Sequence, residues 1–162
     1  MSAAAAVGLY ALKDYVDIKA LKPLILLLND KNDTIRAGAA GALAQYAEKN
    51  LFNNEALEPL TKLLSDKVSD VRMRAVAAIG LYAEKNLFNN EALKPLTKLL
   101  SDENKTTLTT AAITLVLYAL NGLIYNFALQ PLIGLLSDKD SNIRGNGALA
   151  IGIYAEKGLQ NE

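Results

Sequence analysis

The sequence predicts an all-α protein, a right-handed α-solenoid of about nine helices that alternate as A and B helices through one repeat domain over residues 1–162. The first observation behind this prediction is that the segment YAEKNLFNNEAL begins at Tyr46 and is repeated without change from Tyr82, 36 residues later. The second is a sequence motif, ALxPLxxLLSD in its commonest form, which recurs every 36 residues from Ala20, Ala56, Ala92 and Ala128. The third is that each unit holds two segments with helical spacing of apolar residues, and a fixed period of roughly 20–50 residues marks a solenoid.

The repeat sets the order of the elements. Residues 3–13 (AAAAVGLYALK) align with residues 75–85 (AVAAIGLYAEK), so the chain is expected to open inside a B helix within a half unit over residues 1–19. Four A–B pairs are expected to follow at about residues 20–55, 56–91, 92–127 and 128–162.

Repeat two illustrates the A helix. Its leucines at positions 57, 60, 63 and 64 fall on one face of a helix. The helix is expected to start near Asn54, whose side chain can cap free amides, which puts Pro59 slightly deep in the first turn.

The B helix of the same repeat follows the turn SDKVSD, with Ser69 as the expected N-cap. Its end places Lys85 in the last turn, where the helix dipole favours a cation. The buried face is expected to comprise Val71, Ala75, Ala78, Ile79 and Tyr82.

Composition narrows the functions that such a fold can carry. The chain has no Cys and no His, so disulfides, thiolate metal sites and the commonest general base are missing, and no cofactor or metal is expected. Seventeen basic residues balance seventeen acidic ones, which leaves no net charge to attract nucleic acid or anionic lipid. No apolar run approaches the roughly 20 residues of a membrane span, and the N-terminus lacks a signal-peptide pattern, so a cytoplasmic protein is expected.

The segment ALEPLTKLLSDKVSDVRMRAVAAIGLYAE resembles the HEAT and armadillo class of α-solenoid repeats, and more closely the short HEAT-like type of phycobilin-lyase-related proteins. The residues that carry the resemblance are the A-helix motif ALxPLxxLLSD, the pair Val71-Arg72 that opens the B helix, and the motif AxxAIG that follows this pair. Four such units cover essentially the whole chain. The resemblance implies a scaffold that binds proteins or peptides on the concave face of its B helices, although a minority of the class bind nucleic acid or act as enzymes.

Two departures from the class restrict what the resemblance implies. Armadillo proteins that hold extended peptides carry an asparagine ladder, and the matching positions of this chain hold Leu9, Gln45, Leu81, Leu117 and Ile153 instead. Clamping of a peptide backbone is therefore not expected. HEAT-like iron hydroxylases need His-Glu pairs, and the lack of histidine excludes that activity.

The predicted concave face is mostly apolar. A contiguous apolar patch that faces solvent usually marks an interaction surface. The alternative is that the B helices are rotated by one position, which would make these side chains ordinary core. The candidate protein-binding residues are Leu9, Gln45, Ala77, Leu81, Ile113, Leu117, Leu149 and Ile153.

Two further columns recur at fixed register. Lysines that end the B helices form a possible rim for an acidic peptide, or simply complement the helix dipoles: Lys13, Lys49, Lys85 and Lys157. Aspartates of the A–B turns and arginines of the B helices are expected to form a structural ladder. Because Leu108 replaces the arginine of repeat three, Asp102 is expected to lack its in-register partner.

Repeat three departs from the sequence that the first two repeats share. Its segment GLIYNF stands where repeats one and two have NLFNNE, so Tyr125 and Phe127 occupy positions that hold Asn and Glu in those repeats. A contact made only by this repeat and neutral drift both account for the change, and the sequence does not separate them.

The expected function is a non-catalytic scaffold or adaptor that binds a protein or helical peptide on the concave B-helix face through apolar contacts. The alternative is a structural module that associates with itself end to end, as a fragment of a longer array or as an engineered repeat protein. An enzyme or a nucleic-acid reader is disfavoured, because the chain has no His or Cys, no phosphate-binding glycine loop and no basic excess.

Overall fold

The computed structural model describes residues 17–158, and within that range all regular structure is helical. It contains eight α-helices and four short 3-10 helices. The B helix expected over residues 3–13 lies outside the described residues. The chain divides into two compact units at Asn89 and Asn90. A single repeat domain over the whole chain stays a prediction.

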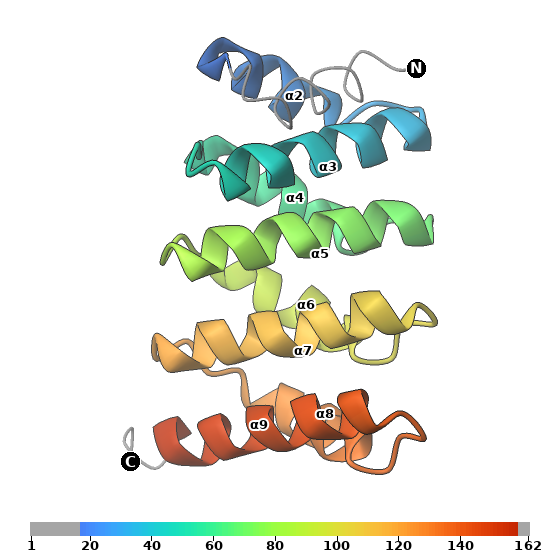
Figure 1. Ribbon diagram of the computed structural model, residues 1–162, viewed down its shortest axis with the longest axis vertical. Helices are drawn as coiled ribbons and strands as arrows, with labels where there is room; N and C mark the ends of the chain where they lie inside the picture. Colours follow the sequence, from blue (N-terminus) through green and yellow to red (C-terminus); the bar gives the residue numbers. More distant parts are fainter. Residues whose placement is uncertain (1–16, 159–162) are drawn as a thin grey trace. The chain divides into compact units, whose positions relative to one another are not determined.

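Unit 1 holds repeats one and two. The first repeat has the 3-10 helix η1 (Ile18–Ala20), the A helix α2 (Leu21–Leu27) and the B helix α3 (Asp33–Glu48). The second has η2 (Asn54–Ala56), α4 (Leu57–Leu63) and α5 (Ser69–Glu84). Each A helix packs on its own B helix, and α3 lies alongside α5 (Figure 1).

Unit 2 repeats this arrangement. Repeat three has η3 (Asn90–Ala92), α6 (Leu93–Leu99) and α7 (Lys105–Leu120), and repeat four has η4 (Asn126–Ala128), α8 (Leu129–Leu135) and α9 (Ser141–Gly158). Here α7 lies alongside α9, and the A helices pack behind them in the view of Figure 1. The expected order of alternating A and B helices is confirmed for the described residues.

The tyrosines that recur every 36 residues belong to the core. Tyr46, Tyr82, Tyr118 and Tyr154 are all buried. The hydroxyl of Tyr46 donates to the carbonyl of Asp17 at 3.2 Å, and that of Tyr82 donates to the carbonyl of Asn53 at 3.3 Å. All four tyrosines therefore fill core space, and Tyr46 and Tyr82 also fix the loop before an A helix.

The A helices begin later than the sequence predicts. In repeat two a 3-10 turn occupies residues 54–56, and α4 starts only at Leu57. The capping residue is Asn53 rather than Asn54, because its side chain accepts a hydrogen bond from the amide of Glu55 at 2.9 Å. Pro59 is consequently the third residue of α4, in the first turn, where the missing N–H breaks no helical hydrogen bond.

The prediction of Ser69 as the N-cap of α5 is wrong. Ser69 is the first helical residue, and the N-cap is Val68, which offers no side-chain hydrogen bond. The equivalent residues Asn32 and Asn104 cap α3 and α7 by accepting from backbone amides at 2.8 and 3.1 Å. The N-cap therefore lies one residue before the predicted position, and in repeat two a valine occupies it.

Helices α3, α5 and α7 are each followed by a residue in the left-handed conformation. Lys85 is the C-cap of α5 rather than part of its last turn, and Asn86 follows with φ at 59°. The amide of Leu87 then donates to the carbonyl of Tyr82 at 3.0 Å, which satisfies a free carbonyl of the helix end. Asn50 adopts the same conformation after α3, and Gly122 does so after α7.

Candidate binding surface on the B helices

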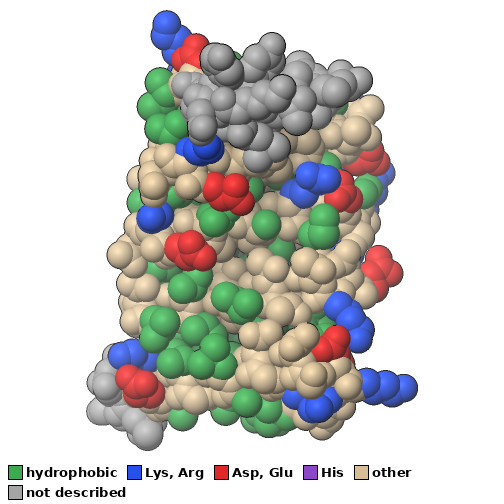
Figure 2. Space-filling view, viewed as in Figure 1, with side chains coloured by type: hydrophobic (Ala, Val, Ile, Leu, Met, Phe, Trp, Pro, Cys, Tyr) green, Lys and Arg blue, Asp and Glu red, His purple; other side chains and the backbone are tan. Residues whose placement is uncertain are grey.

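The B-helix face of unit 2 carries exposed aliphatic side chains. Ile113 on α7 and Leu149 on α9 occupy the same repeat position and are 43% and 54% exposed. Leu117 and Ile153 lie one helical turn further along the same helices and are half-buried. Figure 2 shows hydrophobic side chains gathered between the C-terminal turns of α7 and α9. Two adjacent helices therefore present a joint apolar surface to solvent.

Leu120 extends this surface and was missed by the sequence reasoning. It is the last residue of α7 and is 46% exposed. The other repeats hold glutamate at this position, as Glu48, Glu84 and Glu156. The replacement of an acidic side chain by leucine was the signal that could have revealed it.

The same face of unit 1 is more polar. Gln45, Ala77 and Leu81 are half-buried there, as predicted for a surface facing solvent. The guanidinium of Arg74 lies over Gly41, with Nη1 2.9 Å from where a Cβ of that glycine would be. Arg74 is itself held by Asp70, since its Nε donates to the carboxylate at 3.0 Å.

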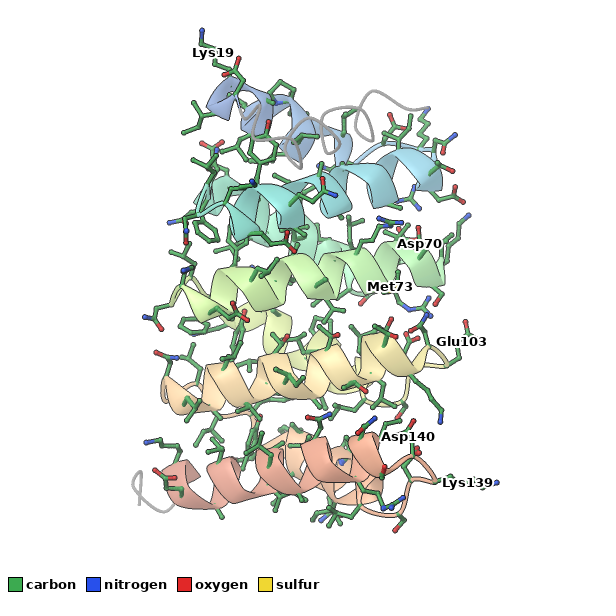
Figure 3. All side chains as sticks on the ribbon, viewed as in Figure 1. Lys19, Asp70, Met73, Glu103, Lys139 and Asp140 are labelled. Atoms are coloured by element: carbon green, nitrogen blue, oxygen red, sulfur yellow. The ribbon has the colours of Figure 1, made fainter. Side chains whose placement is uncertain are left out.

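The position of this ion pair along the helix limits the apolar surface of unit 1. Figure 3 shows Asp70 and Met73 in the first turns of α5, whereas Leu81 lies in the last turn of this helix. The N-terminal half of this face is therefore charged, and its apolar part is confined to the C-terminal half.

None of the seven described candidates on this face is buried: Gln45, Ala77, Leu81, Ile113, Leu117, Leu149 and Ile153 are half-buried or exposed. Their neighbours Tyr46, Tyr82, Tyr118 and Tyr154 are in the core. Leu9 lies outside the described residues. The alternative in which these side chains are ordinary core therefore does not apply to the described helices, and their role in binding stays a prediction.

The lysine rim is placed at the helix ends. Lys49 and Lys85 are exposed C-caps, and Lys157 lies in the last turn of α9, 3.2 Å from Glu156. Lys13 lies outside the described residues. These positions suit the negative ends of the helix dipoles. A grip on an acidic peptide stays a prediction.

Tyr125 and Phe127 form an aromatic pair before α8. Their ring centroids are 5.4 Å apart, and Phe127 is 78% exposed. Tyr125 is the N-cap of η4 but provides no side-chain hydrogen bond, whereas its counterpart Asn53 caps the same turn in repeat two. Repeat three thus gives up a cap for exposed aromatic surface, and a contact specific to this repeat stays a prediction.

The aspartate–arginine ladder links neighbouring repeats. Arg36 of repeat one donates to both carboxylate oxygens of Asp66 in repeat two, at 2.8 and 3.1 Å. Its Nη1 also donates to the carbonyls of Asp30 and Lys31 in its own A–B turn. The same residues therefore join an A–B turn, its B helix and the next turn, as the structural interpretation expected.

Leu108 stands at the arginine position of the repeat that holds Asp102, but in the pair Arg36–Asp66 the arginine comes from the preceding repeat. In that register the replacement at Leu108 affects Asp138 of repeat four. Asp102 is not left without a partner. Asp138 accepts from the amide of Asp140 at 2.8 Å and forms no ion pair with any described residue.

Electrostatics at Asp66 favour its charged form. Partial burial raises the pKa of this carboxyl, but the hydrogen bonds from Arg36 and from the amide of Val68, together with the arginine charge, outweigh it. The pKa of Asp66 consequently lies below its ordinary value.

The described part of the chain was searched for metal-binding clusters and for helices that could span a membrane. Between residues 17 and 158 no group of three or more His, Cys, Asp or Glu side chains is arranged to hold a metal ion. No helix in that range has the length and apolar character required to cross a bilayer.

Comparisons with known proteins agree with the architecture. The family model described as HEAT repeats matches residues 2–80. Computationally designed armadillo repeat proteins for modular peptide recognition have 29% sequence identity, with a TM-score of 0.79 over 97% of this chain and 78% of that one. A designed armadillo repeat protein in complex with the peptide (KR)4 has 27% identity, with a TM-score of 0.73 over 98% of this chain and 80% of that one.

A crystal structure of an engineered protein is also similar, with 27% identity and a TM-score of 0.77 over 94% of this chain and 73% of that one. No protein in the comparison with curated proteins matches. The chain is an all-α repeat solenoid of helix pairs that is similar to HEAT repeats over residues 2–80 and to designed armadillo repeat proteins, so the resemblance seen in the sequence is confirmed.

Proposed function

We propose that this scaffold is non-catalytic and binds a protein or a helical peptide on its B-helix face, mainly through apolar contacts in unit 2. The observation that carries the proposal is the exposure of Ile113 and Leu149 at equivalent positions of two adjacent helices. Full burial of one such side chain contributes about 1.5–3 kcal/mol relative to full exposure. Leu117, Leu120 and Ile153 enlarge the surface that a partner would cover.

The chemistry of the face favours a helical partner over an extended one. Extended peptides need backbone partners, and neither Leu117 nor Ile153 offers the amide that an asparagine ladder would supply. An amphipathic helix satisfies its own backbone and presents side chains at helical spacing, which suits an aliphatic surface. Similar designed proteins made for peptide recognition support peptide binding by this scaffold.

Catalysis is not part of the proposal. Members of this family are typically non-catalytic scaffolds. The sequence provides no imidazole or thiol, so nucleophilic or general-base chemistry would require a carboxylate, lysine or tyrosine in a site of its own. The face of α7 and α9 holds aliphatic and threonine side chains instead.

A phage-displayed library of amphipathic helical peptides tests the proposal. Peptides enriched on the parent chain should lose at least about tenfold in affinity for the double variant Ile113→Asn/Leu149→Asn, because the partner would then bury polar groups. Leu26→Asn is the matched control, since Leu26 is 70% exposed on α2, away from the B helices. Equal binding to the parent and the double variant, with unchanged circular dichroism, would refute this site.

The self-association that the sequence leaves as the alternative stays a prediction.

A further inference from the structure

The B helix of repeat three ends on an asparagine that is followed by a glycine. Asn121 is the C-cap of α7, and Gly122 follows it with φ at 77°. Both residues are exposed. Among the four repeats, only repeat three has an Asn-Gly pair at this helix end, because the others hold a lysine at the position of Asn121: Lys49, Lys85 and Lys157.

An asparagine that precedes glycine is chemically labile. The backbone nitrogen of the glycine attacks the side-chain carbon Cγ, forms a C–N bond and loses its proton to solvent, while the side-chain nitrogen leaves as ammonia. Water then opens the cyclic imide to aspartate or isoaspartate. Glycine favours the attack because it has no Cβ to hinder it and adopts the required backbone angles without strain.

The chain holds a second Asn-Gly pair in a different setting. Asn146 and Gly147 lie inside α9, and Gly147 is buried against α8. A Cβ at Gly147 would lie 2.8 Å from the Cβ of Leu135 and 3.3 Å from the carbonyl oxygen of Leu132, whereas nothing lies within 4 Å of the Cβ position of Gly122. The same dipeptide therefore occurs once in a packed helix interior and once at an exposed helix end.

Both pairs must leave their backbone conformation before they can react. Asn121 has ψ at 17°, which turns the amide of Gly122 away from Cγ, and Asn146 is held in the helix. Two hydrogen bonds oppose the opening at the end of α7: Nδ2 of Asn121 donates to the carbonyl of Leu117, and the amide of Gly122 donates to that of Ala119, both at 2.9 Å. Opening at Asn146 would in addition separate α9 from α8. Local opening of an exposed helix end costs less free energy than opening of a packed interior.

We propose that Asn121 is a site of spontaneous deamidation in the folded protein, and that the packing of Gly147 protects Asn146. The product places a carboxylate at the C-terminal end of α7, where the helix dipole disfavours a negative charge. It also lacks the Nδ2 donor that bonds to the carbonyl of Leu117. The modification therefore weakens this helix end and puts a charge into residues 120–129, which carry none.

Peptide mapping by mass spectrometry measures the conversion at both sites while the chain is incubated in mildly alkaline buffer. In the folded chain Asn121 should convert at least about tenfold faster than Asn146, because its helix end opens more often. In urea the two rates should become similar, since both asparagines then precede an unrestrained glycine. Equal rates in the folded chain, or no conversion at Asn121, would overturn the proposal. A difference that persisted in urea would do the same.

Gly122→Asn is the matched variant, because repeats one and two have Asn50 and Asn86 at this position in the same left-handed conformation. Asparagine tolerates that conformation, and nothing lies within 4 Å of the new Cβ, so the variant is expected to fold. Conversion at Asn121 should slow at least about tenfold, while conversion at Asn146 stays as in the parent. Unchanged conversion at Asn121 would contradict the attack by the Gly122 nitrogen. The readout is mass alone, so this proposal and the proposed peptide site can fail independently.

Discussion

Arg36 and Asp66 are thirty residues apart in sequence and form a two-pronged ion pair between repeats one and two, with N–O distances of 2.8 and 3.1 Å. Both side chains are nearly buried, at 12% and 8% exposure. Arg36 also binds two carbonyls of its own A–B turn. Unlike an exposed salt bridge, this pair is desolvated and geometrically fixed, so loss of one partner leaves a charge without compensation.

Replacement of Arg36 should therefore destabilise unit 1. We expect Arg36→Leu to lower the free energy of unfolding by about 2–4 kcal/mol, because Asp66 is left as a largely buried carboxylate without its cation. Urea denaturation followed by circular dichroism measures the change. Arg144→Leu is the control: Arg144 is exposed and donates to carbonyls of its own turn, so a smaller loss is expected. Equal losses would show that the contact between repeats contributes nothing.

The lowered pKa of Asp66 predicts the pH dependence of this contribution. The folded state binds a proton at Asp66 less readily than the unfolded chain does. The stabilisation is therefore complete above the ordinary carboxyl pKa and disappears as the pH falls through the lowered value. Asp66→Asn should cost most stability near neutral pH, and the difference from the parent should shrink in acid. A difference that stayed constant down to the acid limb would contradict the assignment.

Thr107 on α7 should be replaceable with a gain in stability. Its side chain is completely buried, and its hydroxyl finds no hydrogen-bond partner among the described residues. The equivalent residues Val71 and Ile143 are aliphatic. We expect Thr107→Val to raise the free energy of unfolding by about 1 kcal/mol, because the change removes an unsatisfied polar group at nearly constant volume. Thr106→Val, at an exposed position, should change it little in the same urea titration.

Two glycines of α9 should respond oppositely to alanine. A Cβ at Gly147 would lie 2.8 Å from the Cβ of Leu135 and 3.3 Å from the carbonyl of Leu132, so α8 would have to move. We expect Gly147→Ala to destabilise unit 2 by about 1–3 kcal/mol. Gly145 has nothing within 4 Å of its Cβ position, and Gly145→Ala should stabilise by up to about 1 kcal/mol. Thermal unfolding of both variants provides the comparison, and a shift in the same direction would contradict it.

The repeat pattern was sufficient to predict helix order, because apolar spacing and the 36-residue step report the same buried faces several times over. Helix starts were less predictable. The cap at Asn53 and the N-cap position of Val68 differ from expectation by one residue, since a 3-10 turn and a capped helix start use similar residues. Local sequence does not distinguish the two.

The candidate site was predicted only in part. Helical spacing indicated that Ile113 and Leu149 lie on a solvent-facing side, and both are exposed. It did not reveal that Arg74 reaches across to Gly41, because a long side chain crosses between helices in a way that no single-helix pattern records. For the same reason the pairing of Asp66 with the preceding repeat required the structure.

An NMR titration of methyl-labelled Ile and Leu side chains with a library-enriched helical peptide tests the central claim most directly. We predict chemical-shift changes at Ile113, Leu117, Leu149 and Ile153, with little change at Ile18 and Leu26 of unit 1. Shifts confined to the A helices or to α8, or no saturable shift at all, would contradict the claim that the B-helix face is the working surface.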